Sequence, residues 1–136
     1  MKKLLSVLCL TLCFAMTVHA REAVPIVNIE NQTFTSGSGK TLSTGDVKAA
    51  IARAAASLQW SVVDADANQL TATLFVRNKH TVIATITYSG NSFSIIYKDS
   101  INMKYGVSNG TPVIHPFYNK WILSLANAIR MEMQKL

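Results

Sequence analysis

The spacing of hydrophobic residues along the chain changes near residue 60 and again near residue 115. Before the first change, apolar residues recur at i, i+3 and i+4, which predicts an amphipathic helix with Ser43 or Thr44 as its N-cap. The members of this stripe are Val47, Ala50, Ile51, Ala54 and Leu58.

A second helix is predicted at the C-terminal end of the chain. Pro116 suits the first turn of a helix, because the N–H that proline lacks has no partner there, and His115 then lies at the cap position or just before it. The same helical spacing follows at Tyr118, Trp121, Ile122, Leu125 and Ile129.

Between the predicted helices the period is two. Four runs are rich in the β-branched and aromatic residues that favour strands. They read WSVVDA, QLTATLFVR, TVIATITY and SFSIIYKDS. A two-residue turn at Gly90-Asn91 sets apolar residues against each other: Tyr88 with Phe93, Ile86 with Ile95 and Ala84 with Tyr97. The alternation predicts an antiparallel meander of four strands.

The other two turns are predicted from the same requirement. A three-residue loop at Asn78-Lys79-His80 pairs Val76 with Val82, Leu74 with Ala84 and Ala72 with Ile86. A turn through Asp66-Ala67-Asn68 pairs Trp60 with Leu74 and Val62 with Ala72. One sheet face then carries the apolar residues Trp60, Val62, Leu70, Leu74, Val76, Val82, Ile86, Tyr88, Phe93, Ile95 and Tyr97.

These elements predict an α+β fold in the order α-β-β-β-β-α, with both helices packed on the apolar face of the sheet. The predicted domain spans residues 44–136 and follows an extended segment, residues 21–43. Within that segment Val24, Ile26 and Val27 are candidates for an extra edge strand.

The opposite sheet face is rich in threonine and serine, as expected of a face turned to solvent. Its polar members are Thr71, Thr73, Thr85, Thr87 and Ser94. Phe75, Ile83 and Ile96 point the same way, with Arg77 and Lys98 beside them, and together they form a candidate interaction patch. Two alternatives stay open: the N-terminal segment or a loop covers these residues, or single apolar residues are tolerated outside.

Residues 1–20 have the composition of a cleaved signal peptide. Lys2 and Lys3 precede the apolar run Leu4 to Val18, and Val18-His19-Ala20 ends in a small residue suited to signal peptidase. The apolar run is shorter than the ~20 residues of a membrane-spanning helix. We therefore expect export to the periplasm, with no transmembrane segment in the mature chain.

The positions of the cysteines and the distribution of charge bear on disulfides, lipid anchoring and nucleic-acid binding. Cys9 and Cys13 both lie in the predicted signal peptide, so the mature chain is expected to have no disulfide. The residues before these cysteines lack the small side chains that lipid attachment requires, which disfavours a lipid anchor. Without Lys2 and Lys3 the 13 basic residues fall to 11, against 7 acidic ones, a formal +4 that is scattered along the chain. We expect no nucleic-acid partner.

The segment from Asp99 to His115 contains two glycines and a proline and is predicted to be a long loop, where binding residues concentrate. The candidate loop site consists of Ser100, Asn102, Tyr105, His115, Tyr118 and Asn119. A small hydrolase using Ser100, His115 and Asp99 is an alternative, although the strained turn and oxyanion donors of such enzymes have no signature here. The structural alternative is that His115 and Asn119 tie the loop to the helix start.

Several other chemistries are disfavoured. After residue 20 the only histidines are His80 and His115 and there is no cysteine, so no metal site is expected. The seven acidic residues form no obvious catalytic pair. The glycine-containing stretch SGSGK lacks the spacing of a phosphate-binding loop, and we expect no cofactor.

The C-terminal third contains a distinctive motif. A serine follows a tyrosine-containing strand, then comes Asn-apolar-x-Tyr, and Ile-His-x-x-Tyr-Asn-x-Trp stands at the start of the last helix. The residues of this motif are Ser100, Asn102, Met103, Tyr105, Ile114, His115, Tyr118, Asn119 and Trp121. In this motif the chain resembles a family of small, uncharacterised proteobacterial periplasmic proteins and lipoproteins. The resemblance implies an envelope protein without an established activity. We therefore expect an exported, non-enzymatic protein that binds an envelope protein or a small ligand.

Overall fold

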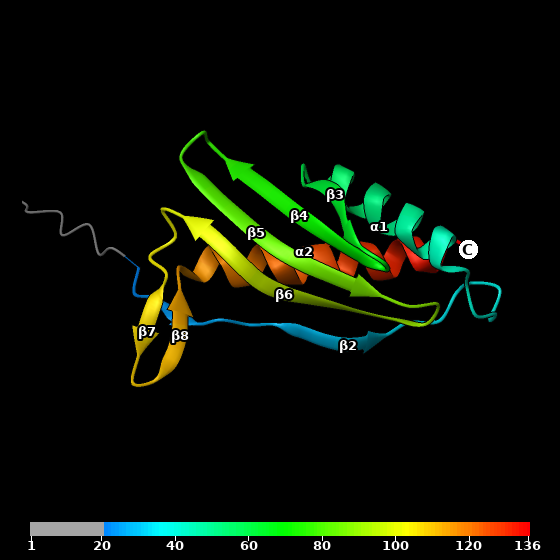
Figure 1. The fold of residues 1–136 in the computed structure, drawn as a ribbon, viewed down its shortest axis with the longest axis horizontal. Coiled ribbons are helices and arrows are strands. Elements are labelled where there is room, and N and C mark those ends of the chain that lie inside the picture. Colours follow the sequence, from blue (N-terminus) through cyan, green and yellow to red (C-terminus); the bar gives the residue numbers. More distant parts are fainter. Residues whose placement is uncertain (1–20) are drawn as a thin grey trace, which may run out of the picture.

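The computed structural model describes residues 21–136 and has two helices and two antiparallel sheets (Figure 1). The predicted α+β class is therefore confirmed. The signal-peptide prediction, with Cys9 and Cys13, falls on residues 1–20 and lies outside the described residues.

The larger sheet has five strands in the order β2-β6-β5-β4-β3. Its strands are β2 (Ile29–Thr33), β3 (Ser61–Asp66), β4 (Gln69–Val76), β5 (His80–Tyr88) and β6 (Ser92–Ile101). Strands β3 to β6 form the predicted meander, because each is hydrogen-bonded to the next along the chain. The N-terminal segment adds β2 as a fifth strand at the edge beside β6. This edge strand begins at Ile29, two residues after the predicted candidates end, whereas the candidate Val24 lies in a strand at the edge of the second sheet.

The smaller sheet has the order β1-β8-β7 and was not predicted. Its strands are β1 (Val24–Pro25), β7 (Gly106–Ser108) and β8 (Thr111–Ile114). The prediction of a long loop from Asp99 to His115 was wrong, because β7 and β8 form a hairpin there. Asn109 and Gly110, with φ of 49° and 77°, make the kind of two-residue turn that joins hairpin strands. Strands this short, one of them containing Pro112, leave no clear alternation in the sequence.

The predicted register between β5 and β6 is confirmed at Tyr88–Phe93, Ile86–Ile95 and Ala84–Tyr97. Beyond these pairs the register shifts, and Ile83 lies opposite Asp99. One extra residue in β6 reverses which residues face each side of the sheet. Asp99 and Ile101 consequently face outward and Ser100 faces inward, opposite Val82.

The predicted register between β4 and β5 was wrong by two residues. The turn spans Arg77–Lys79, so Val76 pairs with His80 and Leu74 with Val82. Arg77 and Asn78 have φ of 54° and 50°, and Lys79 N–H donates to Val76 C=O at 3.1 Å. An even shift leaves every side chain on its predicted face, so the core is unaffected. Between β3 and β4 the pair Val62–Ala72 is confirmed, but the ladder ends at Ser61–Thr73, short of Trp60–Leu74.

The helices are α1 (Thr44–Ser57) and α2 (Pro116–Met133), each with a predicted N-cap residue. Ser43 Oγ accepts from Asp46 N–H at 3.1 Å, and His115 Nδ1 accepts from Phe117 N–H at 3.1 Å. These bonds satisfy main-chain donors that a helix start leaves unpaired. In the described part of the chain, neither helix is long and apolar enough to cross a membrane.

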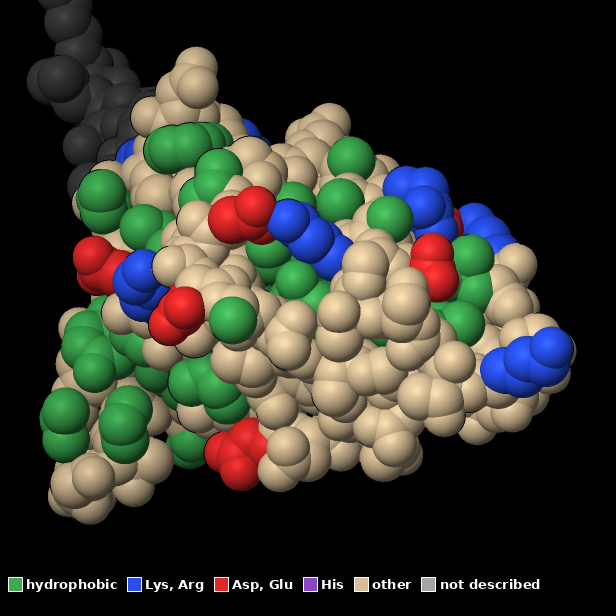
Figure 2. All heavy atoms as spheres, turned by 45° about the vertical axis from the view of Figure 1, so that its right-hand side comes forward, with side chains coloured by type: hydrophobic (Ala, Val, Ile, Leu, Met, Phe, Trp, Pro, Cys, Tyr) green, Lys and Arg blue, Asp and Glu red, His purple; other side chains and the backbone are tan. Residues whose placement is uncertain are grey.

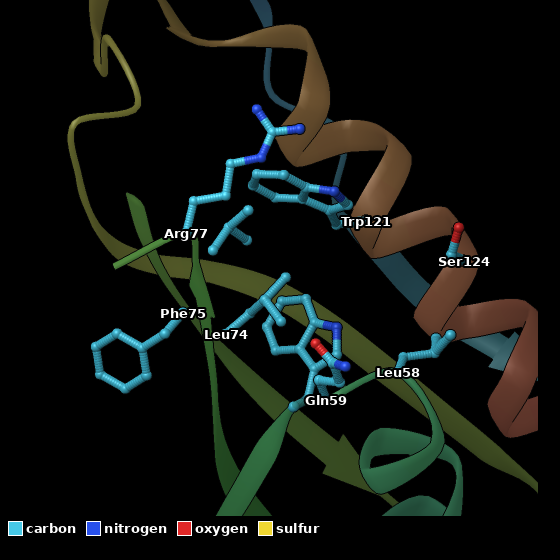
Figure 3. A pocket seen from close by; sticks show the side chains of 9 residues that line it. Leu58, Gln59, Leu74, Phe75, Arg77, Trp121 and Ser124 are labelled. Carbon is cyan, nitrogen blue, oxygen red and sulfur yellow. The ribbon is translucent and has the colours of Figure 1, made fainter. Parts of the chain in front are cut away.

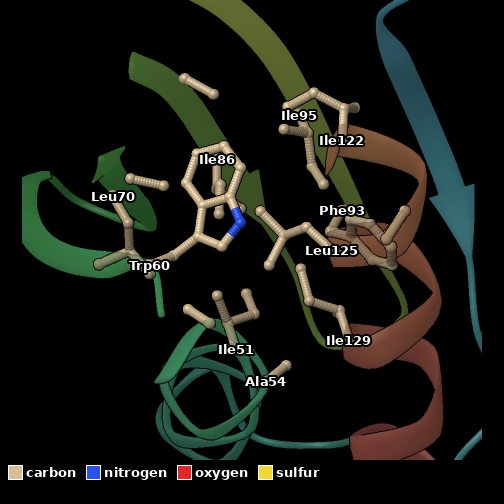
Figure 4. Close-up of a cluster of buried hydrophobic side chains, with 14 of the residues drawn as sticks. Ile51, Ala54, Trp60, Leu70, Ile86, Phe93, Ile95, Ile122, Leu125 and Ile129 are labelled. Carbon is tan, nitrogen blue, oxygen red and sulfur yellow. The ribbon is translucent and has the colours of Figure 1, made fainter. Parts of the chain in front are cut away.

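A single hydrophobic core lies between the two helices and one face of the larger sheet (Figure 4). Ile51 of α1, Leu125 of α2 and Ile86 of β5 are all fully buried in it. Trp60 follows α1 and packs among these residues with 4% of its surface exposed. Burying one such side chain stabilises the fold by about 1.5–3 kcal/mol, so this layer holds α1 and α2 against the sheet.

Candidate functional site

A groove runs between the first half of α2 and the end of the β4–β5 hairpin. Its first hollow, of about 390 Å³, lies beside Trp60, Leu74, Arg77 and Trp121 (Figure 3). A second, of about 400 Å³, shares Val76, Arg77 and Trp121 with the first. A third, of about 70 Å³, shares His80, Phe117 and Trp121 with the second. Because neighbouring hollows share walls, we describe them as one feature, the hairpin–helix groove.

Trp121 lines all three hollows and is the centre of this groove. It is half-buried, and its ring lies 5.9 Å from that of Phe117, one helical turn earlier. Figure 3 shows the Arg77 side chain extending from the hairpin toward the Trp121 indole. The groove therefore has an aromatic and aliphatic floor, the type of surface that buries an apolar ligand group.

The rim of the groove is positively charged. Arg77 and Lys120 line the second hollow and are exposed. Lys120 Nζ lies 5.5 Å from the centre of the Phe117 ring, and the Arg21 guanidinium lies 4.7 Å from it. Within residues 21–136, no Asp or Glu lines any of the three hollows. An apolar floor with a cationic rim complements a ligand that carries both an apolar group and a negative charge.

His115 lines the third hollow and also caps α2. Burial lowers the pKa of His115 below its usual value of 6.5, and the nearby Lys104, Arg21 and His80 add to this effect. Its Nδ1 accepts the Phe117 N–H, so the neutral ring carries its proton on Nε2. The cap consequently depends on the uncharged imidazole.

The predicted loop site is only partly brought together. Ser100 Oγ lies 2.9 Å from Tyr97 OH, the Tyr105 ring stacks on Tyr97 at 4.8 Å, and the Tyr118 ring meets Tyr97 edge-on at 5.5 Å. Three of the six residues thus surround Tyr97. Tyr118 is fully buried, its hydroxyl has no hydrogen-bond partner among the described residues, and burial raises its pKa well above the usual value.

The other three loop-site residues make separate structural contacts. Asn102 Nδ2 donates to Lys79 C=O at 2.7 Å, and His80 Nδ1 lies 2.7 Å from Asn102 C=O. His115 caps α2, as the structural alternative predicted. Asn119 bonds to the N-terminal segment rather than to the loop, accepting from Val27 N–H and donating to Pro25 C=O.

The residues of the hydrolase alternative are likewise engaged elsewhere. Ser100 Oγ is paired with Tyr97 OH, and His115 Nδ1 with Phe117 N–H. Asp99 Oδ1 accepts the N–H of Ser100 at 2.7 Å, and the bulge turns Asp99 to the outer sheet face. These contacts do not supply the Ser–His–Asp hydrogen-bond chain that activates a serine.

The predicted interaction patch lies on the outer sheet face. Phe75 is 66% exposed, whereas Ile83 and Ile96 are half-buried. Lys98 Nζ reaches Thr71 Oγ1 across this face at 3.4 Å, but Arg77 lies in the turn and lines the groove. Figure 2 shows that hydrophobic side chains on one face of the molecule lie in small groups between polar surface and Lys and Arg side chains.

Sequence reasoning did not assign several residues to these surfaces. Ile101, 58% exposed, joins Phe75 on the outer face because the bulge in β6 reverses its direction, and a bulge has no sequence signature here. Phe117 was not assigned to the groove, although an aromatic residue outside the buried stripe of α2 was an available signal. Trp121 was assigned to the core, and only its half-exposure reveals its second role.

Among residues 21–136, no three His, Asp or Glu side chains form a group suited to a metal ion. Comparison of the chain with family models, with curated proteins and with solved structures gives no match. The family resemblance of the C-terminal third therefore stays a prediction.

Proposed function

We propose that this chain is an exported envelope protein that acts by binding, and that it holds an acidic segment of another envelope protein in the hairpin–helix groove. The observation that carries this proposal is the combination of the half-buried Trp121 floor with the exposed cations Arg77 and Lys120. The signal-peptide composition of residues 1–20 supports the compartment.

The two parts of the groove contribute differently to binding. Removing an apolar side chain from water against Trp121 and Val76 supplies affinity, at roughly 25 cal/mol per Å² of apolar surface. A guanidinium such as that of Arg77 recognises a carboxylate with two parallel hydrogen bonds, and it gives orientation as well as energy. The cations also speed the approach of an acidic partner in a salt-dependent manner.

The groove has better support as the binding surface than the outer patch. Its walls are hollowed, whereas Ile83 and Ile96 lie along a pleated sheet face with threonines between them. Phe75 lies at the edge of the first hollow, but its side chain points away from it (Figure 3). Arg77, which the patch required as a cation, faces the groove. The hydrolase alternative has little support, because Ser100 Oγ and His115 Nδ1 have other hydrogen-bond partners.

The test is a titration of residues 21–136 with the peptide acetyl-Asp-Phe-Asp-Phe-Asp-amide, followed by tryptophan fluorescence. We expect a salt-sensitive change that is absent with the matched lysine peptide acetyl-Lys-Phe-Lys-Phe-Lys-amide. The double variant Arg77→Ala, Lys120→Ala should weaken binding at least tenfold, whereas the control Lys98→Ala should not.

A second variant examines the floor of the groove. Trp121→Ala should weaken peptide binding strongly, which calorimetry measures. Circular dichroism would establish that this variant keeps its fold. Unchanged affinity in a folded Trp121→Ala variant, or equal binding of the acidic and basic peptides, would overturn the proposed function.

A further inference from the structure

The groove lies beside a stretch of sheet edge that has no neighbouring strand. The ladder between β3 and β4 begins at the pair Ser61–Thr73, but β4 continues to Val76. Residues 74–76 are therefore paired only with β5 on their other side. Gln59, with φ of 65°, turns the chain between α1 and β3, so β3 starts too late to cover this stretch.

At this open edge, one residue, Phe75, has a main-chain N–H and C=O that face away from β5. In an antiparallel ladder, residues two apart turn their N–H and C=O toward the same neighbour. Thr73 C=O accepts from Ser61 Oγ at 3.4 Å, so Thr73 faces β3. Phe75 follows two residues later and turns its N–H and C=O to the same side, past the end of β3. Unpaired groups of this kind are a template for another strand.

We infer that the groove's occupant is an extended peptide segment that adds as a short strand to β4 by pairing with the main chain of Phe75. This inference rests on the proposed function, since it says how the acidic segment is held. Strand addition takes its affinity from main-chain hydrogen bonds and its specificity from pockets for alternate side chains.

The position of the first hollow fits this arrangement. It is bounded by Leu74 and Val76 on the β4 side and by Trp121 and Ser124 on the α2 side (Figure 3). Successive side chains of a strand point to opposite faces of a sheet. An added strand would thus insert every second side chain into the hollow and place the others on the outer face beside Phe75.

This arrangement is consistent with the positions of Phe75 and Arg77 at the end of β4. Phe75 is a large apolar residue with 66% of its surface exposed, and the main chain of an added strand would run beside it and shield part of that surface. Arg77 follows the open stretch directly, so its guanidinium is available to a carboxylate near the end of the added strand. The ligand class is consequently an extended acidic peptide with apolar residues at alternate positions.

The test is to methylate the main-chain nitrogens of acetyl-Asp-Phe-Asp-Phe-Asp-amide one at a time. Phe75 offers one C=O at the open edge, so one main-chain N–H of the peptide pairs with it. We expect affinity to fall at least tenfold for methylation at that single position and less than threefold at the others. A uniform effect at all positions would overturn strand addition.

A measurement on the protein gives an independent readout. Binding of the unmethylated peptide should slow hydrogen exchange of the Phe75 amide at least tenfold, because that amide gains an acceptor. Exchange of the Phe75 amide unchanged at saturation would overturn the inference. If the acidic peptide binds and loses affinity with Trp121→Ala but fails these two tests, the proposed function stands and only the strand pairing is wrong. If no peptide binds, both are wrong.

Discussion

The main-chain N–H of Val27 donates a 2.9 Å hydrogen bond to Oδ1 of Asn119, a residue 92 positions further along the chain. The side-chain amide of Asn119 also donates, through Nδ2, to Pro25 C=O at 2.9 Å. One side chain of α2 thus serves as both donor and acceptor for the N-terminal segment. That segment supplies an edge strand to each sheet. The two hydrogen bonds of Asn119, which we call the Asn119 clamp, therefore connect α2 to both sheets.

We expect Asn119→Ala to lower the free energy of unfolding by about 1–3 kcal/mol, because it leaves two main-chain groups without their partner. Urea denaturation measures this loss, and limited proteolysis should show faster cleavage within residues 21–28. The matched control is Lys120→Ala, the next residue on the same helix, which is exposed. Equal stability of the two variants would show that the clamp contributes nothing.

Stability should fall as the pH is lowered through the titration of His115. The pKa of His115 is lowered in the folded protein, so the unfolded chain takes up its proton first. The stabilisation by neutral His115 is fully present above pH 6.5 and is lost as the pH falls from 6.5 through the folded-state pKa. Protonation also removes the acceptor that caps Phe117 N–H.

The variant His115→Asn isolates this effect. Asparagine is a good N-cap whose charge does not change between pH 7.5 and 5. The variant should therefore keep the start of α2 and lose part of the pH dependence of stability in that range. His115→Ala should cost about 1 kcal/mol at neutral pH through the lost cap. Urea denaturation at several pH values measures both, and an unchanged pH profile in His115→Asn would refute the assignment.

Two tyrosine variants should differ in the sign or size of their effect. Tyr118 OH is buried without a protein partner among the described residues, so Tyr118→Phe should leave stability unchanged or raise it by up to about 1 kcal/mol. Tyr97→Phe removes the hydrogen bond with Ser100 and should lower stability by about 0.5–1.5 kcal/mol. Thermal denaturation compares them. A larger loss of stability in Tyr118→Phe than in Tyr97→Phe would indicate an internal water bonded to the Tyr118 hydroxyl.

Arg77→Gly should separate stability from binding. Arg77 has φ of 54°, a conformation that disfavours side chains with a Cβ and suits glycine. We expect the variant to be as stable as the natural protein or up to about 1 kcal/mol more stable, while its affinity for the acidic peptide falls. Urea denaturation and the fluorescence titration measure the two quantities. A clear loss of stability would mean that Arg77 supports the fold rather than the ligand.

The candidate site could be predicted only in fragments. Arg77 was predicted as a cation of the interaction patch, but it was assigned to the outer face because the turn was placed one residue too late. Trp121 was predicted as a core residue, which is half of its role. The groove itself needs the chain at Trp60, the β4–β5 hairpin and α2 to meet, and no local pattern encodes how far β3 extends along β4.

Local sequence patterns were sufficient to predict the two helices, their caps, the meander and which side chains of β3 to β5 face the core. Periodicity and capping are local, and an error of two residues in a register changes no face. The bulge in β6, the second sheet, the edge strand β2 and the groove could be seen only in the folded chain. Each of these depends on the meeting of distant segments, as in the hydrogen bond between Asn119 and Val27 or the shared lining of the groove by Arg77 and Trp121, and such contacts can outweigh local preference.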